Sequence, residues 1–181
     1  LTAHAEVGDR TLEGVQPWVG VDTAGCGFEE VRSEEGGSVS NLDEAAFVLG
    51  RAVEWLTMHP GISLGIVAPY AAQVETLREG WSERLRAQPE LREAAVTIHT
   101  VDGFQGQERD AMLVSLTRSN DKGEVGFLRE SRRIHVAQTR AKMACMLVGD
   151  SATLSSDPFL ADLFDFAQAN DAYDSAWSWM V

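Results

Sequence analysis

The chain has 181 residues, of which 44% are hydrophobic, a length and composition that suit one folded domain with its own core. The sequence has no apolar run long enough to cross a bilayer and no basic start followed by an apolar segment, so we expect no membrane partner, no secretion signal and a cytoplasmic location, or a nuclear one in a eukaryote. The formal net charge of −13 argues against a uniformly basic nucleic-acid binder, and two isolated cysteines, Cys26 and Cys145, argue against a disulfide framework or a zinc site, so no metal ligands are predicted.

The N-terminal part of the chain predicts a strand, a loop and a helix. The segment 18–23 predicts a first strand, and the glycines of 24–30 predict a turn, because they lack the Gly-Lys-Ser/Thr ending that a P-loop needs. An exposed loop is expected at 34–38. Asn41 followed by Glu44 resembles a capping box at the start of a packing helix.

A second strand is predicted at 62–68, and it leads directly into the segment Pro69-Tyr70-Ala71-Ala72-Gln73. An apolar stripe then indicates a helix, with Val74, Leu77, Trp81 and Leu85 on one face. From these residues alone, Tyr70 could cap the strand and Gln73 could lie in the first helical turn, or both could contact a ligand at the strand end. The choice stays open at this point.

Strands and helices continue to alternate toward the C-terminus, with strands expected at 96–100, 112–116 and 144–148, a glycine-containing turn at 101–108 and a helix at 132–142. The segment 112–116 is apolar enough for burial on both faces, which is typical of a parallel sheet. Since open parallel sheets bind ligands at the carboxyl ends of their strands, we expect the turn there. The pattern predicts an α/β fold, with a mostly parallel sheet and helices on both faces.

The distribution of charge favours the same stretch. Residues 92–142 hold nine basic and seven acidic residues, whereas the rest of the chain holds six basic and twenty-one acidic residues. A locally basic cleft is therefore compatible with the negative total, and the acidic helices elsewhere keep the domain in solution. After this stretch, Pro158 opens a final packing helix, and the acidic aromatic tail 171–181 either docks on the domain or is disordered.

Four linked segments carry a resemblance to a known family: Thr100–Asp110 (Thr-Val-Asp-Gly-Phe-Gln-Gly-Gln-Glu-Arg-Asp), Arg118-Ser119-Asn120, Gly123–Leu128 (Gly-Glu-Val-Gly-Phe-Leu) and Arg132–Lys142 (Arg-Arg-Ile-His-Val-Ala-Gln-Thr-Arg-Ala-Lys). Their order and spacing resemble motifs V and VI of superfamily 1 helicases, in the branch typified by the nonsense-mediated-decay RNA helicase and the immunoglobulin mu-binding helicase. The resemblance is dense over 97–149 and weaker over 38–77, where the Pro-Tyr-x-x-Gln signature lies.

The resemblance implies a RecA-like, P-loop NTPase-type domain, the second of two domains between which ATP and Mg²⁺ bind. The P-loop lysine and the magnesium-binding acidic motif belong to the first domain and do not occur in this chain, which begins with Leu. We therefore expect an N-terminal RecA-like domain of the same protein as a partner. The expected organisation is a strand and irregular extension at 1–37, the helicase domain at 38–170 and the tail at 171–181.

The resemblance assigns nucleotide-site roles to residues of both motifs. Arg140 matches the arginine finger, which stabilises negative charge on the γ-phosphate during hydrolysis. Glu108 matches the carboxylate that accepts hydrogen bonds from the ribose, and Gly106 allows a close backbone approach beside it. Arg133, on the expected helix face shared with Arg140, is predicted to hold motif V or the phosphate region, and Phe104 is predicted to anchor the turn in the core.

The resemblance also places nucleic acid at the ends of two strands. Pro69, Tyr70 and Gln73 are the expected contacts after the second strand. His99 and Thr100 are expected to contact the backbone of single-stranded DNA or RNA, because short polar side chains commonly bind phosphate. The sequence does not distinguish DNA from RNA.

Two residues depart from the family pattern, and alternative functions stay open. His135 replaces a common Asn and Gln138 replaces an apolar residue, which puts the efficiency of the nucleotide site in question. We expect an ATP-dependent helicase in the full-length protein and no hydrolysis by this chain alone. The alternatives are a non-catalytic interaction module that retained the helicase fold, and a helicase-linked nuclease or defence protein.

Overall fold

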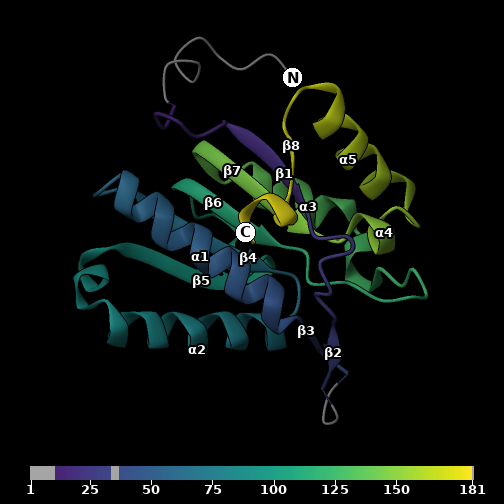
Figure 1. Cartoon of the computed structure of the whole chain (residues 1–181), viewed down its shortest axis with the longest axis horizontal. Helices are drawn as coiled ribbons and strands as arrows, with labels where there is room; N and C mark the ends of the chain where they lie inside the picture. The colour runs from purple at the N-terminus through teal and green to yellow at the C-terminus, as the bar shows by residue number, and fades with distance from the viewer. Residues whose placement is uncertain (1–10, 34–36, 181) are drawn as a thin grey trace.

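The protein's structure, a computed structural model, describes residues 11–33 and 37–180 (Figure 1). Its centre is a six-stranded sheet with the order β5-β4-β6-β7-β1-β8, in which all neighbouring strands are parallel. The strands are β1 (Trp18–Asp22), β4 (Ser63–Ala68), β5 (Ala95–Thr100), β6 (Arg109–Ser115), β7 (Ala141–Gly149) and β8 (Tyr173–Ser175). This topology confirms the predicted α/β class and parallel sheet.

Helices cover both faces of the sheet (Figure 1). They are α1 (Leu42–Met58) and α2 (Ala71–Ala87) on one face, and α3 (Ser131–Gln138), α4 (Ser151–Leu154) and α5 (Pro158–Ala169) on the other. Short elements complete the fold: the hairpin β2 (Val31–Arg32) and β3 (Val39–Ser40), and the 3₁₀ turns η1 (Pro89–Glu93), η2 (Asp102–Phe104), η3 (Gly126–Arg129) and η4 (Ala176–Trp179). The loop predicted at 34–38 comes between β2 and β3 in the sequence, and its residues 34–36 lie outside the described residues.

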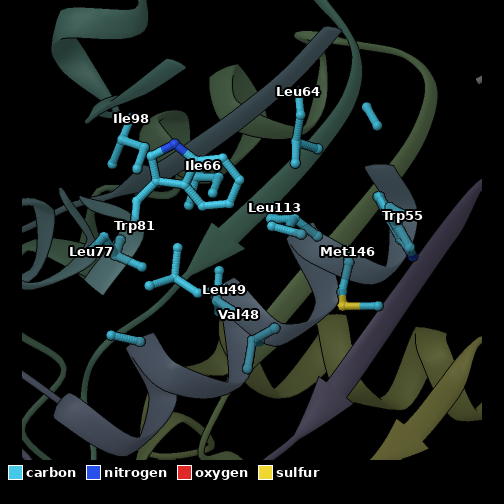
Figure 2. Packing of buried hydrophobic residues seen from close by; sticks show 14 of the residues in the cluster. Val48, Leu49, Trp55, Leu64, Ile66, Leu77, Trp81, Ile98, Leu113 and Met146 are labelled. Carbon is cyan, nitrogen blue, oxygen red and sulfur yellow. The ribbon is translucent and has the colours of Figure 1, made fainter. Parts of the chain in front are cut away.

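Alternating side chains of the central strands build two separate cores. In β6, Leu113 packs with α1 and α2, whereas Met112 and Val114 pack with α3, α4 and α5. Figure 2 shows the first core, in which the helix residues Val48, Leu49, Trp55, Leu77 and Trp81 lie over the strand residues Leu64, Ile66, Ile98, Leu113 and Met146. Burial on both faces explains why the strand sequences are apolar without interruption.

Helix α1 begins with half of the expected capping box. The Asn41 Oδ1 accepts from the Glu44 N–H at 3.0 Å, as predicted. The Glu44 side chain does not reach back to the Asn41 N–H, which instead donates to Gln73 Oε1 at 2.7 Å. The carboxylate of Glu44 turns inward because Ser115 and Thr117 bind it from the sheet.

Helix α3 is shorter than the predicted 132–142. It ends at Gln138, Thr139 caps it, and β7 begins at Ala141. The chain leaves the helix because the Arg140 carbonyl accepts the Arg109 N–H at 3.0 Å and so joins the sheet. Arg140 therefore lies in the turn after α3, and the expectation that Arg133 and Arg140 share one helix face is wrong.

The C-terminal tail docks on the edge of the sheet, which settles the alternative left open by its sequence. Its strand β8 pairs with β1, with Tyr173 opposite Gly20. The Tyr173 hydroxyl donates to Asp22 Oδ2 at 2.8 Å. Burial, followed by the hydrogen bond and charge of Asp22, raises the pKa of Tyr173 to about 12, so the hydroxyl remains a donor. The predicted domain limits, 38–170, stay a prediction. The strands β1 and β8 come from outside this range, and both belong to the sheet.

Substitution of Tyr173 by Phe tests this docking. Tyr173→Phe removes the hydrogen bond to Asp22 and should lower the free energy of unfolding by about 1 kcal/mol. Urea unfolding followed by tryptophan fluorescence measures the change, because Trp177 and Trp179 lie in the same tail. An unchanged unfolding midpoint would show that the tail does not depend on this contact.

Candidate functional site

The predicted site residues lie at the two ends of the parallel strands. We call the side where the strands end the carboxyl edge and the side where they begin the amino edge. Ala68, at the carboxyl end of β4, pairs with Thr100 of β5, whereas Leu64, near the amino end of β4, is level with Ala111 of β6. The turn 101–108 therefore runs from the carboxyl edge to the amino edge. The expectation that the whole turn lies at the carboxyl edge is wrong. Because β5 and β6 are both parallel to β4, the turn that joins them must return from the carboxyl end of β5 to the amino end of β6.

Glu108 and Arg140 are neighbours at the amino edge. The Arg109 N–H donates to the Arg140 carbonyl oxygen at 3.0 Å, and Arg109 pairs with Ala141 in the sheet. Two motifs that are distant in the sequence thus meet where β6 and β7 begin. The Glu108 side chain is exposed there and the Arg140 side chain is half-buried.

The Arg140 side chain keeps free hydrogen-bonding capacity. Its Nη2 donates to Thr139 Oγ1 at 3.3 Å, whereas its Nε is buried and has no hydrogen-bond partner among the described residues. The Nε2 of Gln138 is buried and, within the same part of the chain, also has no partner. No salt bridge to Arg140 forms within 11–33 and 37–180. The end of α3 therefore carries two donors that no described acceptor satisfies.

Arg109, to which the sequence analysis assigned no role, holds the turn in place. Its Nη1 donates to the Glu108 carbonyl at 2.7 Å, and its Nη2 donates to Thr97 Oγ1 and Gln107 Oε1 at 2.9 Å each. Its guanidinium lies 5.3 Å from the ring centroid of Phe104, which is 1% exposed. The prediction that Phe104 anchors the turn in the core is confirmed.

Gly106 meets a conformational requirement of the same turn. Its φ is +80°, in the left-handed region where a side chain is strained, and a Cβ there would meet nothing within 4 Å. The space beside Gly106 is thus open to solvent or to a ligand.

Arg133 lies at the opposite end of α3 from Arg140. Its Nε donates to both carboxylate oxygens of Asp102 at 3.2 Å, and its Nη1 forms a salt bridge with Glu130 at 2.5 Å. These contacts tie the start of α3 to the turn, beside a cavity of about 290 Å³ that Gln105 also lines. The geometry supports the predicted role of holding motif V, since two carboxylates already neutralise the charge of Arg133.

Gln73 is buried at the carboxyl edge and satisfied within the protein. It is 0% exposed. Its Oε1 accepts from the Asn41 N–H at 2.7 Å, and its Nε2 donates to the Asn41 carbonyl at 3.1 Å and to Ser115 Oγ at 2.9 Å. Its amide is thus bonded within the protein, and its contact with nucleic acid stays a prediction.

Tyr70 is likewise a buried support, at 3% exposure. Its hydroxyl donates to the Val125 carbonyl at 3.3 Å and accepts from the Phe127 N–H and from Arg118 Nη1, both at 3.2 Å. The contact of Tyr70 with nucleic acid likewise stays a prediction. Pro69 is half-buried and remains partly accessible at the end of β4.

His99 and Thr100 are half-buried at the end of β5. The Thr100 N–H donates to His99 Nδ1 at 2.9 Å, and Thr100 Oγ1 accepts from the Gly103 N–H at 3.1 Å. A Cβ on Gly103 would collide with the His99 ring, so this glycine lets the imidazole pack against the turn. Both side chains keep part of their surface at the carboxyl edge.

Comparison with known proteins places this arrangement in a family. A sequence model of the AAA_12 family, described as an AAA domain, matches residues 2–152. The chain is 36% identical to the DNA-binding protein SMUBP-2 of Mesocricetus auratus over 99% of its length and 42% identical to the probable helicase MAGATAMA 3 of Arabidopsis thaliana over 73%. It spans only 18% and 16% of those two relatives.

The chain belongs to the AAA_12 family. Its relatives identify it as a superfamily 1 helicase C-terminal domain of the branch with the nonsense-mediated-decay and immunoglobulin mu-binding helicases. The fold agrees with a solved structure of the C-terminal domain of a possible DNA helicase from Lactobacillus plantarum, at a TM-score of 0.51, with 19% identity over 90% of this chain and 87% of that one. Within the described ranges, none of the helices is long and apolar enough to span a membrane.

The AAA_12 domain also contains a buried carboxyl group that the sequence analysis treated only as part of a helix cap. Glu44 is 0% exposed, and its Oε1 accepts from Ser115 Oγ at 2.5 Å and from the Thr117 N–H at 2.8 Å. Its Oε2 is buried without a partner among the described residues. Burial raises the pKa of Glu44 to about 7, although the two hydrogen bonds lower it.

Glu44 fixes the backbone that presents Arg118. Thr117 has φ +72°, a left-handed conformation that is costly for a β-branched residue. The next residue, Arg118, is 2% exposed and donates to both carboxylate oxygens of Glu30 at 2.7 and 3.1 Å. The sequence motif Arg118-Ser119-Asn120 singled out this segment. Its pairing with Glu30 could not be predicted, because the two residues are far apart in the sequence and no local pattern connects them.

The stability of the domain should depend on pH through Glu44. The folded-state pKa of Glu44, about 7, is above the usual value for a glutamate. The contribution of Glu44 to the free energy of unfolding is therefore complete at low pH and is lost as the pH rises through 7. Between pH 4.5 and 8, wild-type protein should lose about 3 kcal/mol of unfolding free energy relative to Glu44→Gln. Urea unfolding at several pH values measures this difference.

The matched control is Asp43→Asn, which neutralises the exposed neighbour on the same helix turn. Its stability should follow the wild-type pH profile. Parallel profiles for wild type and Glu44→Gln would contradict the assignment of this titration to Glu44.

Proposed function

We propose that this domain supplies Arg140 and Glu108 to an ATP site that the N-terminal RecA-like domain of the same protein completes. The observation that carries the proposal is the state of Arg140. Its guanidinium forms no salt bridge with any described residue, and its Nε is buried without an acceptor among them. Its backbone adjoins the segment of Glu108, whose side chain is exposed. A cation left in this state suits an anionic ligand, since unsatisfied buried donors cost about 1–3 kcal/mol.

The proposed role of each residue follows from its chemistry. ATP with Mg²⁺ supplies the phosphoryl group and the negative charge that develops on it during hydrolysis. Arg140 would hold a γ-phosphate oxygen from across the domain interface, where the exclusion of water strengthens the attraction. Glu108 would accept hydrogen bonds from the ribose, and the open space beside Gly106 would admit the nucleotide. Arg133 would position the turn through Asp102.

The opposite edge of the sheet would bind a single strand of DNA or RNA. Pro69, His99 and Thr100 are partly accessible there, and short polar side chains commonly contact phosphate oxygens. β6 has 7 residues, so the two edges are separated by about 20 Å at about 3.3 Å per residue. The relatives' names include a DNA-binding protein and a probable helicase, which supports nucleic acid as the ligand.

A second candidate is a non-catalytic interaction module that retained the helicase fold. The acidic surface favours it, since residues outside 92–142 hold six basic and twenty-one acidic residues. A Gly-x-x-x-x-Gly-Lys-Ser/Thr segment preceding this chain in the full-length protein would favour the enzyme, and a first domain without that segment would favour the module.

Arg140→Ala in the full-length protein tests the arginine-finger role. Turnover of ATP should fall by about 10³-fold or more while ATP affinity changes little, because the lost interaction forms mainly in the transition state. Phosphate release and equilibrium binding of a labelled ATP analogue measure the two quantities. Arg86→Ala, which removes an exposed arginine of α2, is the control and should keep wild-type turnover. Normal turnover by Arg140→Ala would remove Arg140 from this role.

The isolated chain should not hydrolyse ATP. It contains the proposed finger and ribose contact but no P-loop lysine, so the phosphates lack most of their contacts. Phosphate release by the purified chain, with and without Mg²⁺, measures the activity. Magnesium-dependent turnover that copurifies with the chain and disappears in Arg140→Ala would contradict the proposed division of the site.

A further inference from the structure

An aromatic ring is exposed at the carboxyl edge of the sheet, in a position to which no role has been given above. Phe127, in η3, is 59% exposed although it lies in a well-packed segment between the buried residues Val125 and Leu128. An exposed phenylalanine costs solvation free energy, and a single one on a surface is common. The surroundings of Phe127 distinguish it from such a residue.

The ring of Phe127 is held in a fixed position. It packs on the ring of Tyr70 with centroids 5.3 Å apart, and its own N–H donates to the Tyr70 hydroxyl at 3.2 Å. Gly126 precedes it with φ +55°, and a Cβ at Gly126 would collide with Arg118 and Tyr70. The backbone at Gly126 thus packs closely against the buried side chains of Arg118 and Tyr70. The exposed ring is therefore already held in place before a ligand binds.

Three arginines lie around this ring, and one of them, Arg129, is unpaired among the described residues. The Arg133 guanidinium lies 5.7 Å from the ring centroid, and Arg129 and Arg32 line a cavity of about 600 Å³ together with Phe127. Arg129 is exposed and forms no salt bridge with any residue of 11–33 and 37–180. The acidic residue of the cavity, Glu124, is 3.5 Å from Arg32 and 3.8 Å from Arg118, so its charge is taken up.

The ring also lies next to the proposed strand-binding residues. Arg133 contacts Phe127 on one side and Asp102 on the other, and Asp102 follows Thr100 closely in the turn. A chain of contacts therefore connects Thr100 to Phe127 along the carboxyl edge. A planar apolar face beside Arg129, whose guanidinium forms no salt bridge within the described ranges, matches one ligand chemistry, a nucleobase joined to phosphates.

We infer that Phe127 is a stacking platform for one unpaired base of a bound single strand, and that Arg129 contacts a neighbouring phosphate. The inference rests on the proposed binding of a single strand at this edge. Stacking does not depend on the identity of the base, so the platform would accept DNA and RNA alike.

The test measures binding of labelled single-stranded DNA and RNA to the full-length protein by fluorescence anisotropy. Phe127→Ala should weaken binding about 5- to 100-fold, and Phe127→Trp should keep wild-type affinity, because a larger aromatic face still stacks. Phe127→Leu keeps an apolar side chain without the planar face and should behave as Phe127→Ala does. Arg129→Ala should reduce the salt slope of binding by about one.

Phe166→Ala is the matched control, since Phe166 is 57% exposed but lies on α5, remote from the carboxyl-edge turn. It should bind the strand as wild type does. A scan of single abasic sites along the oligonucleotide adds a direct readout: one position should weaken binding to wild type and have no further effect on Phe127→Ala.

The possible outcomes separate this inference from the proposed function. Normal binding by Phe127→Ala, with wild-type protein binding the strand, would overturn the platform and leave the strand-binding proposal intact. No binding by wild type would overturn both. Equal loss with every abasic position, or a loss of ATP turnover without nucleic acid in Phe127→Ala, would instead show that the ring packs against another part of the protein, and would also overturn the platform.

Discussion

The parallel pairing of β6 with β7 is the constraint on which both edges of this domain depend. Side chains of β6 alternate between two cores, with Met112 and Leu113 on opposite faces and both 0% exposed. A shift of the pairing by one residue would turn each core residue to the wrong face. The register is therefore fixed, and with it the hydrogen bond from Arg109 to the Arg140 carbonyl. The nearness of Glu108 and Arg140 is a consequence of core packing in strands that neither residue belongs to.

The connections before and after β6 both run from the carboxyl edge of the sheet to the amino edge. The turn 101–108 crosses from the carboxyl edge to the amino edge before β6, and α3 crosses in the same direction before β7. Arg133 links the two crossings through Asp102 at 3.2 Å, at the end of α3 remote from Arg140. One short helix therefore separates Arg133, near the carboxyl edge, from Arg140, at the amino edge.

The sequence was sufficient for the features that local pattern and motif spacing determine. Apolar runs such as 112–116 predicted buried parallel strands, which the sheet confirms. It was insufficient where long-range partners decide. Gln73 is polar at a strand end in the sequence, but its partners Asn41 and Ser115 come from distant segments and bury it. Helix α3 ends at Gln138 because the Arg140 carbonyl accepts a hydrogen bond from the Arg109 N–H in the sheet. Helical periodicity in the sequence does not predict that bond.

The pairing of arginines explains how a chain with a net charge of −13 could present cations to phosphates. Arg118 pairs with Glu30, Arg133 pairs with Asp102 and Glu130, and these guanidinium groups are occupied in holding the fold. Within the described ranges, Arg129 and Arg140 form no salt bridge, and they lie at opposite edges of the sheet. The net charge counts all these residues equally, although a paired guanidinium has little attraction left for a phosphate. The capacity to bind anions therefore follows the unpaired arginines, which only the folded structure distinguishes from the others.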